Sequence, residues 1–171
     1  RKMMLIVILV MSCLFCDDSR YVRMSVPITI QVDLFEEAVD LIIFHEGWHD
    51  GKDGYVGYGH KLSRADNFDH NISKEFAKDL VKRDLLSKCV TFREFKKDSL
   101  LLGVLAYNVG ENNVIKSRMV DMMRNGKRNI YHEYMSFCHI DGKKSNVLVK
   151  RRLREFNLLY NKTNNLIFNG F

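Results

Sequence analysis

The sequence predicts an α+β protein that is mostly helical and carries one short β-hairpin. Apolar residues recur at helical spacing in most segments beyond residue 33. A glycine-rich stretch over residues 55–62 alternates in the manner of a short, bent hairpin. The 171 residues are 46% hydrophobic and include one proline, a composition typical of a compact helix-rich chain that is long enough to bury a core.

The first residues have the composition of an export signal. Basic residues precede an apolar stretch over residues 3–15, which is too short to span a bilayer as a mature helix. Cys13 follows a run that resembles a lipoprotein signal, whereas the residue before Cys16 is the bulky Phe15. We expect an exported protein of the periplasm or cell envelope, either anchored as a lipoprotein at Cys13 or secreted.

The organisation expected after this signal is one folded domain without internal repeats. Cys89 and Cys138 are the cysteines of that domain, and their separation leaves open whether they form a disulfide or remain two buried thiols. The full assignment is a signal peptide or lipoprotein leader over 1–16, a connector over 17–32, the domain over 33–160 and a tail over 161–171.

Two long helices are expected in the first half of the domain. Asp33 and Glu36 form the pattern of a capping box at the start of the first helix. Glycine and Asp-Gly pairs within 47–54 end this helix and form turns. Ser73 is expected to cap a second helix that runs to about Cys89. The apolar residues of the first helix recur at helical spacing: Leu34, Ala38, Leu41 and Ile42.

The second half of the domain is expected to be helical as well. Residues 100–107 are apolar on almost all sides, which predicts a buried central helix. Shorter helices are expected over 115–123 and 130–137, followed by a polar loop over 139–145. A final helix is expected over 150–160.

The charge of the chain narrows the classes of partner. A formal net charge of +6 favours anionic partners, which include bacterial wall polymers, nucleic acid and acidic membranes. The sequence shows neither a basic stripe interleaved with aromatic residues nor a nucleic-acid-binding motif. We therefore expect no nucleic-acid partner, and contact with a membrane only through a lipid anchor.

Glu46 is the candidate catalytic residue. It ends an apolar helical run and is followed within fifteen positions by the predicted hairpin. Burial disfavours the charged form of a carboxyl group and raises its pKa, so a glutamate in such a place can hold a proton near neutral pH and donate it. A glutamate before a glycine can also be an ordinary solvated residue at a helix end. The arrangement suggests acid catalysis on a glycosidic bond.

A zinc-protease pattern overlaps this glutamate. Residues 45–49 read His-Glu-Gly-Trp-His, in which two histidines one helical turn apart would bind zinc. That mechanism needs both histidines on one continuous helix. Gly47 lies inside the pattern and Asp50-Gly51 follows at once, so we expect His49 to fall beyond the helix end and expect no metal site.

Five segments in order resemble the phage-type lysozymes of glycoside hydrolase family 24. Their order and approximate spacing hold from about residue 34 to residue 160. The short loop before the hairpin is similar to the bacterial, exported or prophage-derived branch of that family. The segments are Glu46-Gly47, Gly57-Tyr58-Gly59-His60, the helix opening at Ile72-Ser73, Ala106-Tyr107-Asn108-Val109-Gly110, and Lys150-Arg151-Arg152 with Glu155.

The resemblance implies a lysozyme-like two-lobe fold over the catalytic domain, with a small β-hairpin lobe, a larger helical lobe, and a long helix from Ser73 that links them. It implies hydrolysis of the β-1,4 bond between N-acetylmuramic acid and N-acetylglucosamine in bacterial peptidoglycan, with Glu46 as the general acid. No cofactor is implied. The implied partner is a peptidoglycan glycan strand, bound by a monomer.

The resemblance also assigns residues near the cleft. His60 matches a mainly structural histidine that packs the hairpin against the helix carrying the acid. Asn108 matches the end of the central helix, which borders the cleft. Arg151 or Arg152 matches a residue near Glu46 that tunes its charge.

The chain departs from the family in the loop between the glutamate and the hairpin, which is shorter here. Asp53 and Asp50 both lie in this loop, and Asp53 is nearer the hairpin, so the second catalytic carboxylate is assigned to Asp53 with Asp50 as the alternative. Both also fit ordinary turn chemistry, because each precedes a glycine. Tyr55 stands where the family has a threonine. An inverting mechanism needs carboxyl groups roughly 6.5–9.5 Å apart.

Two other functions stay open. A lytic transglycosylase could use the same Glu46, with the sugar's own hydroxyl attacking to form an anhydro product. A wall-binding relative could keep the fold without catalysis. Trp48 could stack on a sugar face beside the acid or serve as a core anchor, and His49 could hydrogen-bond near the acid or be exposed.

Overall fold

The structure is a computed structural model that describes residues 6–8 and 29–161. The proposed acylation site and the tail after residue 161 lie outside the described residues. The leader and the connector are described only at Ile6–Ile8 (β1) and Thr29–Gln31 (β2), which pair as antiparallel strands. None of the helices in the described part is long and apolar enough to cross a membrane.

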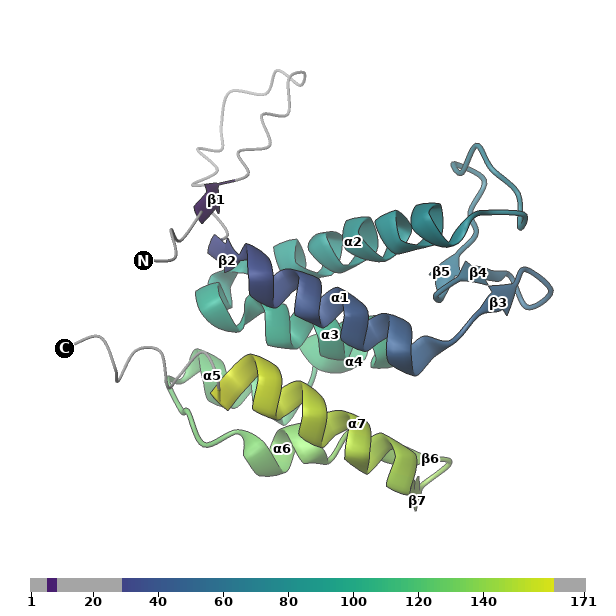
Figure 1. Ribbon diagram of the computed structural model, residues 1–171. Helices are drawn as coiled ribbons and strands as arrows, with labels where there is room; N and C mark the ends of the chain where they lie inside the picture. The colour runs from purple at the N-terminus through teal and green to yellow at the C-terminus, as the bar shows by residue number, and fades with distance from the viewer. Residues whose placement is uncertain (1–5, 9–28, 162–171) are drawn as a thin grey trace, which may run out of the picture.

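Helices make up most of the described chain (Figure 1), and the predicted α+β, mostly helical class is confirmed. The two longest are α1 (Val32–Glu46) and α2 (Lys74–Thr91). The others are the 3-10 helix η1 (Arg93–Asp98), α3 (Ser99–Val109), α4 (Glu111–Ile115), α5 (Arg118–Arg124), α6 (Tyr131–Met135), α7 (Asn146–Phe156) and the π-helical turn η2 (Asn157–Asn161).

Helix α1 carries the candidate acid to the edge of the core. Its apolar residues Leu34, Ala38 and Ile42 are buried, as their spacing predicts. The helix ends at Glu46 because Gly47 adopts φ +70°, a left-handed conformation that terminates helices. The prediction of Asp33 as N-cap is wrong, since the helix already begins at Val32 and places Asp33 in its first turn, where a negative charge complements the helix dipole.

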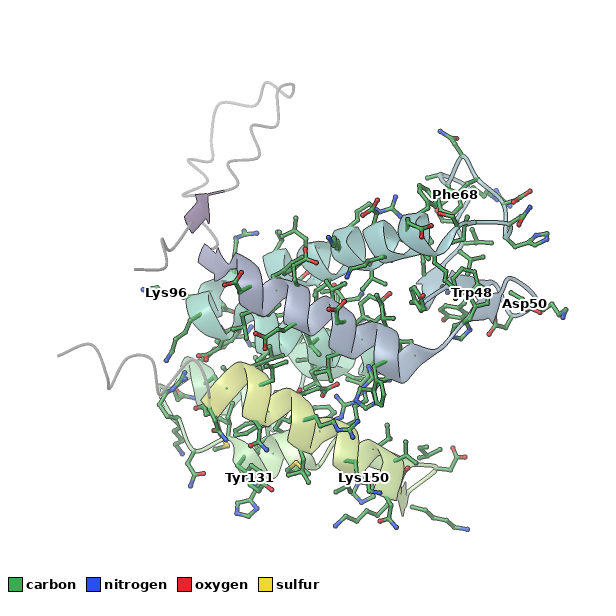
Figure 2. The ribbon with its side chains drawn as sticks, viewed as in Figure 1. Trp48, Asp50, Phe68, Lys96, Tyr131 and Lys150 are labelled. Atoms are coloured by element: carbon green, nitrogen blue, oxygen red, sulfur yellow. The ribbon has the colours of Figure 1, made fainter. Side chains whose placement is uncertain are left out.

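A three-stranded antiparallel sheet forms the small lobe. Its strands are β3 (His49–Asp50), β4 (Tyr55–Gly57) and β5 (His60–Lys61), in the order β3-β4-β5. The predicted hairpin over 55–62 is therefore present, and β3 extends it by one strand. Figure 2 shows Trp48 and Asp50 at this end of the molecule, away from Tyr131 on α6. The sheet packs beside the start of α2, with Val56 fully buried.

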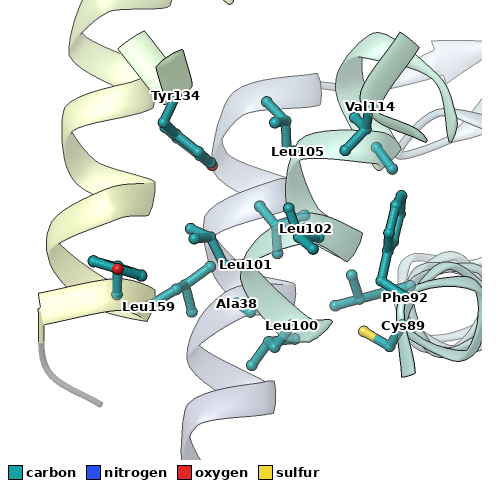
Figure 3. Close-up of a cluster of buried hydrophobic side chains, with 14 of the residues drawn as sticks. Ala38, Cys89, Phe92, Leu100, Leu101, Leu102, Leu105, Val114, Tyr134 and Leu159 are labelled. Atoms are coloured by element: carbon teal, nitrogen blue, oxygen red, sulfur yellow. The ribbon is translucent and has the colours of Figure 1, made fainter. Parts of the chain in front are cut away.

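The central helix α3 is the middle of the core, as predicted. Figure 3 shows its leucines between Ala38 of α1, Phe92 at the end of α2, and Tyr134 of α6. The residues of α3 from Ser99 to Ala106 are all buried. Helix α2 runs from the sheet to this core and joins the two lobes (Figure 1). Ser73 caps it as predicted, since its hydroxyl accepts the backbone N–H of Phe76 at 3.1 Å.

Gly103 on α3 allows the close approach of α2, and we expect Gly103→Ala to destabilise the protein. A Cβ at this position would lie 2.8 Å from the Sγ of Cys89 and 3.3 Å from its backbone nitrogen. Overpacking of this kind costs about 1–3 kcal/mol, which exceeds the gain of up to about 1 kcal/mol in helix propensity. Urea unfolding of Gly103→Ala, Cys89→Ala and the double variant measures the coupling. Purely additive effects would contradict the predicted clash.

The shorter helices differ from the predicted boundaries. The apolar run over 115–123 is divided because the Ser117 hydroxyl accepts the N–H of Val120 and starts α5 there. The expected loop over 139–145 contains strands β6 (His139–Ile140) and β7 (Lys143–Lys144), joined by a tight turn in which Asp141 and Gly142 have positive φ.

The last helix also starts earlier than predicted. Helix α7 begins at Asn146 rather than at residue 150, because the Ser145 hydroxyl caps it. Cys89 and Cys138 are both buried free thiols, so the alternative of a disulfide between them is wrong.

Candidate active site

Glu46 lies where α1 ends, and Arg151 of α7 holds one of its oxygens. The Nη2 of Arg151 donates to Oε1 of Glu46 at 2.7 Å. The Glu46 side chain is 18% exposed and the Arg151 side chain 5% exposed, so the pair is largely shielded from water and Glu46 keeps the greater exposure. The expectation that an arginine of the 151–152 pair lies near Glu46 is met by Arg151.

The second oxygen of Glu46 faces the turn between β4 and β5. A Cβ built on Gly59 would lie 3.7 Å from Oε2 of Glu46 and 3.7 Å from Cε1 of Tyr107, and the residue has φ +90°. The turn therefore lies beside the carboxyl group, and its positive φ favours glycine at this position. Among the residues that the structure describes, Arg151 alone hydrogen-bonds the Glu46 carboxyl group, so Oε2 is left for another partner.

Tyr107 connects α3 to the hairpin beside this carboxyl group. Its hydroxyl donates to the backbone carbonyl of Tyr58 at 3.0 Å. Burial raises the pKa of Tyr107, and the negative charges of Asp84 and Glu46 raise it further. The hydroxyl thus stays protonated at physiological pH and holds the turn over Glu46.

A buried ionic network lies behind Arg151. The Nε of Arg151 donates to Oε1 of Glu155 at 2.9 Å, and Nη1 of Arg152 donates to Oε2 of Glu155 at 2.7 Å. The hydroxyl of Tyr134 donates to the same Oε2 at 2.8 Å. Arg152 also donates to the side-chain oxygen of Asn108 at the end of α3. Asn108 therefore joins the candidate site through Arg152.

The sequence analysis named Glu155 within a segment that resembles the family but gave it no role, and it did not identify Tyr134. Glu155 follows Arg152 and Arg151 by three and four residues, the spacing of neighbours on one helical face, and this spacing could have indicated the ionic contacts. Tyr134 comes from another helix, α6, and its sequence gives no comparable signal. The fully buried Glu155 is satisfied by three donors, as a buried charge must be.

Arg151 is charged and His45 is neutral at physiological pH. Burial acts to lower the pKa of Arg151, but the neighbouring Glu46 and Glu155 outweigh this, and its pKa is raised. Burial lowers the pKa of His45 to about 4, and Arg151, Arg154 and Arg152 add to this effect. His45 is therefore neutral near pH 7, while Arg151 is charged.

The two histidines of the zinc-protease pattern lie on different elements. Helix α1 ends at Glu46, and His49 begins strand β3. His45 and His49 are thus not neighbours on one helical face, as the intervening Gly47 predicted. Glu46 pairs with Arg151 rather than standing between two histidines.

The polar residues of the shortened loop form a second group on the hairpin. The backbone N–H of Tyr55 donates to Oδ1 of Asp53 at 3.0 Å, and Nδ1 of His49 lies 3.2 Å from Oδ2 of Asp53. These contacts, the backbone one first, lower the pKa of Asp53. Asp50 instead pairs with Lys52 at 2.5 Å, which lowers the pKa of Asp50. Both aspartates are exposed and anionic.

His60 anchors the hairpin, but to a different helix from the one expected. Its Nδ1 lies 2.6 Å from Oδ2 of Asp84 on α2, and its Nε2 lies 3.4 Å from Oδ2 of Asp66. The hydrogen-bond partner of His60 is thus on α2, against which β5 lies, and not on α1, which carries the acid. The buried His60 thus fixes the sheet on the helix that joins the lobes.

Two aromatic side chains of the small lobe, Trp48 and Tyr55, are exposed. Trp48 is 47% exposed and meets the ring of Tyr58 edge-on, with centroids 5.4 Å apart. The alternative that Trp48 is a core anchor is therefore wrong. Tyr55 is exposed as well, and its ring centroid lies 6.0 Å from that of His49.

Comparison with solved structures finds the same fold. An endolysin from Escherichia coli O157:H7 phage FAHEc1 has a TM-score of 0.57 and 19% identity, over 74% of this chain and 92% of that one. The muramidase domain of SpmX from Asticaccaulis excentricus has a TM-score of 0.58 and 18% identity, over 72% and 95%. A variant of P22 lysozyme has a TM-score of 0.52 and 19% identity, over 72% and 94%. The predicted lysozyme-like fold is confirmed.

Comparison with known sequences identifies the family of the chain. Curated proteins give no significant match. The profile of the phage lysozyme family matches residues 48–155, a range that starts just after Glu46 and ends at Glu155. This range contains the hairpin, the helix that joins the lobes and the buried arginines, and it covers well over half of the 171 residues. The chain therefore belongs to the phage lysozyme family.

Proposed function

We propose that the protein is a lysozyme that hydrolyses the β-1,4 bond between N-acetylmuramic acid and N-acetylglucosamine in peptidoglycan, with Glu46 as general acid. Membership of the phage lysozyme family supports peptidoglycan lysis in general. The observation that carries the finer assignment is the position of Glu46. Arg151 holds its Oε1, while Oε2 is directed at the Gly59 turn of a partly exposed site.

In the proposed reaction the protonated Oε2 of Glu46 donates its proton to the bridging glycosidic oxygen. The bond between that oxygen and C1 of N-acetylmuramic acid breaks, and the bonding electron pair leaves with the oxygen. Water adds to C1 and gives its proton to a base. Glu46 is then a carboxylate, which the charged Arg151 stabilises through the 2.7 Å hydrogen bond until the proton returns.

Asp53 is the proposed base. Its two oxygens are fixed by the backbone of Tyr55 and by His49, and these contacts lower its pKa, so that it is anionic at the pH of catalysis. Asp50 is the weaker candidate because Lys52 neutralises it at 2.5 Å. A carboxylate in this role directs water to the face of the sugar opposite the acid.

The exposed aromatic residues are the proposed sugar contacts. Trp48, two residues after the acid, and Tyr55 on β4 are both exposed, and aromatic faces pack well against the apolar faces of sugar rings. The positive charge of the chain favours an anionic wall polymer, and we expect salt to weaken that attraction. The substrate lies outside the cytoplasmic membrane, so this function requires export.

Mass spectrometry of the muropeptides released from purified peptidoglycan tests the proposal. Hydrolysis leaves reducing N-acetylmuramic acid ends. Anhydro ends would instead assign a lytic transglycosylase and reject hydrolysis. Binding to peptidoglycan without any released muropeptide would assign a wall-binding protein and reject both enzymatic functions.

A further inference from the structure

Two carboxylates share the guanidinium of Arg151, and Glu46 is one of them. Nη2 of Arg151 donates a hydrogen bond to Glu46 at 2.7 Å, and Nε donates one to Glu155 at 2.9 Å. Arg151 is 5% exposed and Glu155 is fully buried, so water screens these charges poorly. A change in the charge of Glu155 is therefore transmitted strongly to Arg151 and to Glu46.

Glu155 is fixed more firmly than Glu46. Its Oε2 accepts from the hydroxyl of Tyr134 on α6 at 2.8 Å and from Nη1 of Arg152 at 2.7 Å. Its Oε1 is thereby left to Arg151. Because Tyr134 and Arg152 are both fully buried, Glu155 cannot follow Arg151 if the guanidinium moves.

Because Arg151 also bonds Glu155, it makes a single hydrogen bond to Glu46. An arginine that faces a single carboxylate commonly makes two parallel hydrogen bonds to it. Here Nε of the guanidinium donates to Glu155, and only Nη2 donates to Glu46. Oε2 of Glu46 has no hydrogen bond within residues 29–161, and the positive charge of Arg151 is shared between two carboxylates.

We propose that Glu155 is a positioning residue for the proton donor: by holding Nε of Arg151, it leaves Oε2 of Glu46 open and weakens the electrostatic preference of Arg151 for the ionised form of Glu46. The inference rests on the proposed function, in which Glu46 is the general acid. Glu155 acts only through Arg151 and does not touch the reacting sugar.

The other ionisable groups around Glu46 do not compensate for Glu155. His45 on α1 is neutral near pH 7, because its pKa is lowered to about 4. Tyr107 on α3 is protonated, because its pKa is raised by burial. Asp84 on α2 is bound to His60. The other cations of α7 are Lys150, which is exposed to solvent, Arg152, which is held by Glu155, and Arg154, which lies over the ring of Phe44.

The test is the pH dependence of wall hydrolysis by Glu155→Gln. The acid must be protonated, so activity falls as pH rises through its ionisation. Removal of the Glu155 charge leaves Arg151 to favour charged Glu46, and ionisation then occurs at lower pH. We expect the alkaline limb to move to lower pH by roughly one unit. Glu94→Gln, at an exposed ion pair with Arg124, changes the net charge equally and leaves the limb in place.

An alkaline limb of Glu155→Gln that stays in place or moves to higher pH would overturn the inference. If this variant does not fold, Arg151→Lys provides the test, because the single nitrogen of lysine cannot occupy the positions of both Nε and Nη2 of Arg151. We expect kcat to fall about tenfold with KM unchanged, and a wild-type kcat would overturn the inference. Full activity of Glu46→Gln would reject the proposed function instead, so the two failures are distinguishable.

Discussion

Replacing Glu46 with glutamine is expected to slow wall clearing by about 10²–10⁴-fold, the range that general acid catalysis contributes. The amide has no acidic proton to give to the glycosidic oxygen. Its carbonyl oxygen can still accept the hydrogen bond that Arg151 makes to Oε1, so the fold around the site is retained. Turbidity loss of purified cell walls, followed at several protein concentrations, measures the effect.

Glu36→Gln is the matched control for this substitution. Glu36 lies on the same helix, α1, its side chain is 41% exposed, and it pairs with Lys82 at 2.8 Å and with Lys78 at 3.9 Å. Exposed pairs of this kind contribute about 0–1 kcal/mol, so this variant is expected to clear walls at the wild-type rate. If Glu46→Gln were folded by circular dichroism and cleared walls at a rate within a few-fold of Glu36→Gln, Glu46 would have no part in catalysis.

The features of the fold that are set by neighbouring residues could be predicted from the sequence. The spacing of Leu34, Ala38 and Ile42 identified the core face of α1, and Gly47 identified its end. The hydroxyl of Ser73 marks the start of α2 by a bond three residues away. Glu46 was found for the same reason, since it lies where one periodic pattern stops and the hairpin pattern begins.

The parts of the site that depend on distant contacts could not be predicted in this way. Tyr134 and Glu155 are 21 residues apart, and nothing in either local pattern indicates that they meet. His60 was correctly expected to anchor the hairpin, but its partner Asp84 is 24 residues away on α2. The starts of α5 and α7 were placed poorly because a single serine side chain decides each of them, Ser117 for α5 and Ser145 for α7.

The candidate site depends on contacts between the lobes rather than on one element. The hydroxyl of Tyr107 binds the Tyr58 carbonyl, His60 binds Asp84, and Gly59 approaches Glu46. These contacts place the hairpin over the end of α1. On the opposite side the ionic network of α7 fixes Arg151 against the same carboxyl group. The acid is therefore positioned from both lobes, which explains why so many of its supporting residues are buried.

Arg152→Ala is expected to destabilise the protein by about 3–5 kcal/mol. Arg152 is the largest fully buried side chain of the described residues, and it bonds both Glu155 and Asn108. Its removal leaves the negative charges of Glu46 and Glu155 with Arg151 as their shared cation, deprives Asn108 of its donor and opens a cavity in the core. Denaturant unfolding followed by circular dichroism measures the loss.

Arg154→Ala gives the comparison, because the same side chain is removed from the same helix at an exposed position. Arg154 lies over the ring of Phe44 at 5.1 Å, and Phe44 is 67% exposed, so that contact is worth no more than about 1 kcal/mol. A cost for Arg152→Ala as small as that for Arg154→Ala would mean that the network is not formed in solution. Arg151 would then have no fixed anchor, and the geometry that leaves Oε2 of Glu46 free would lose its physical basis.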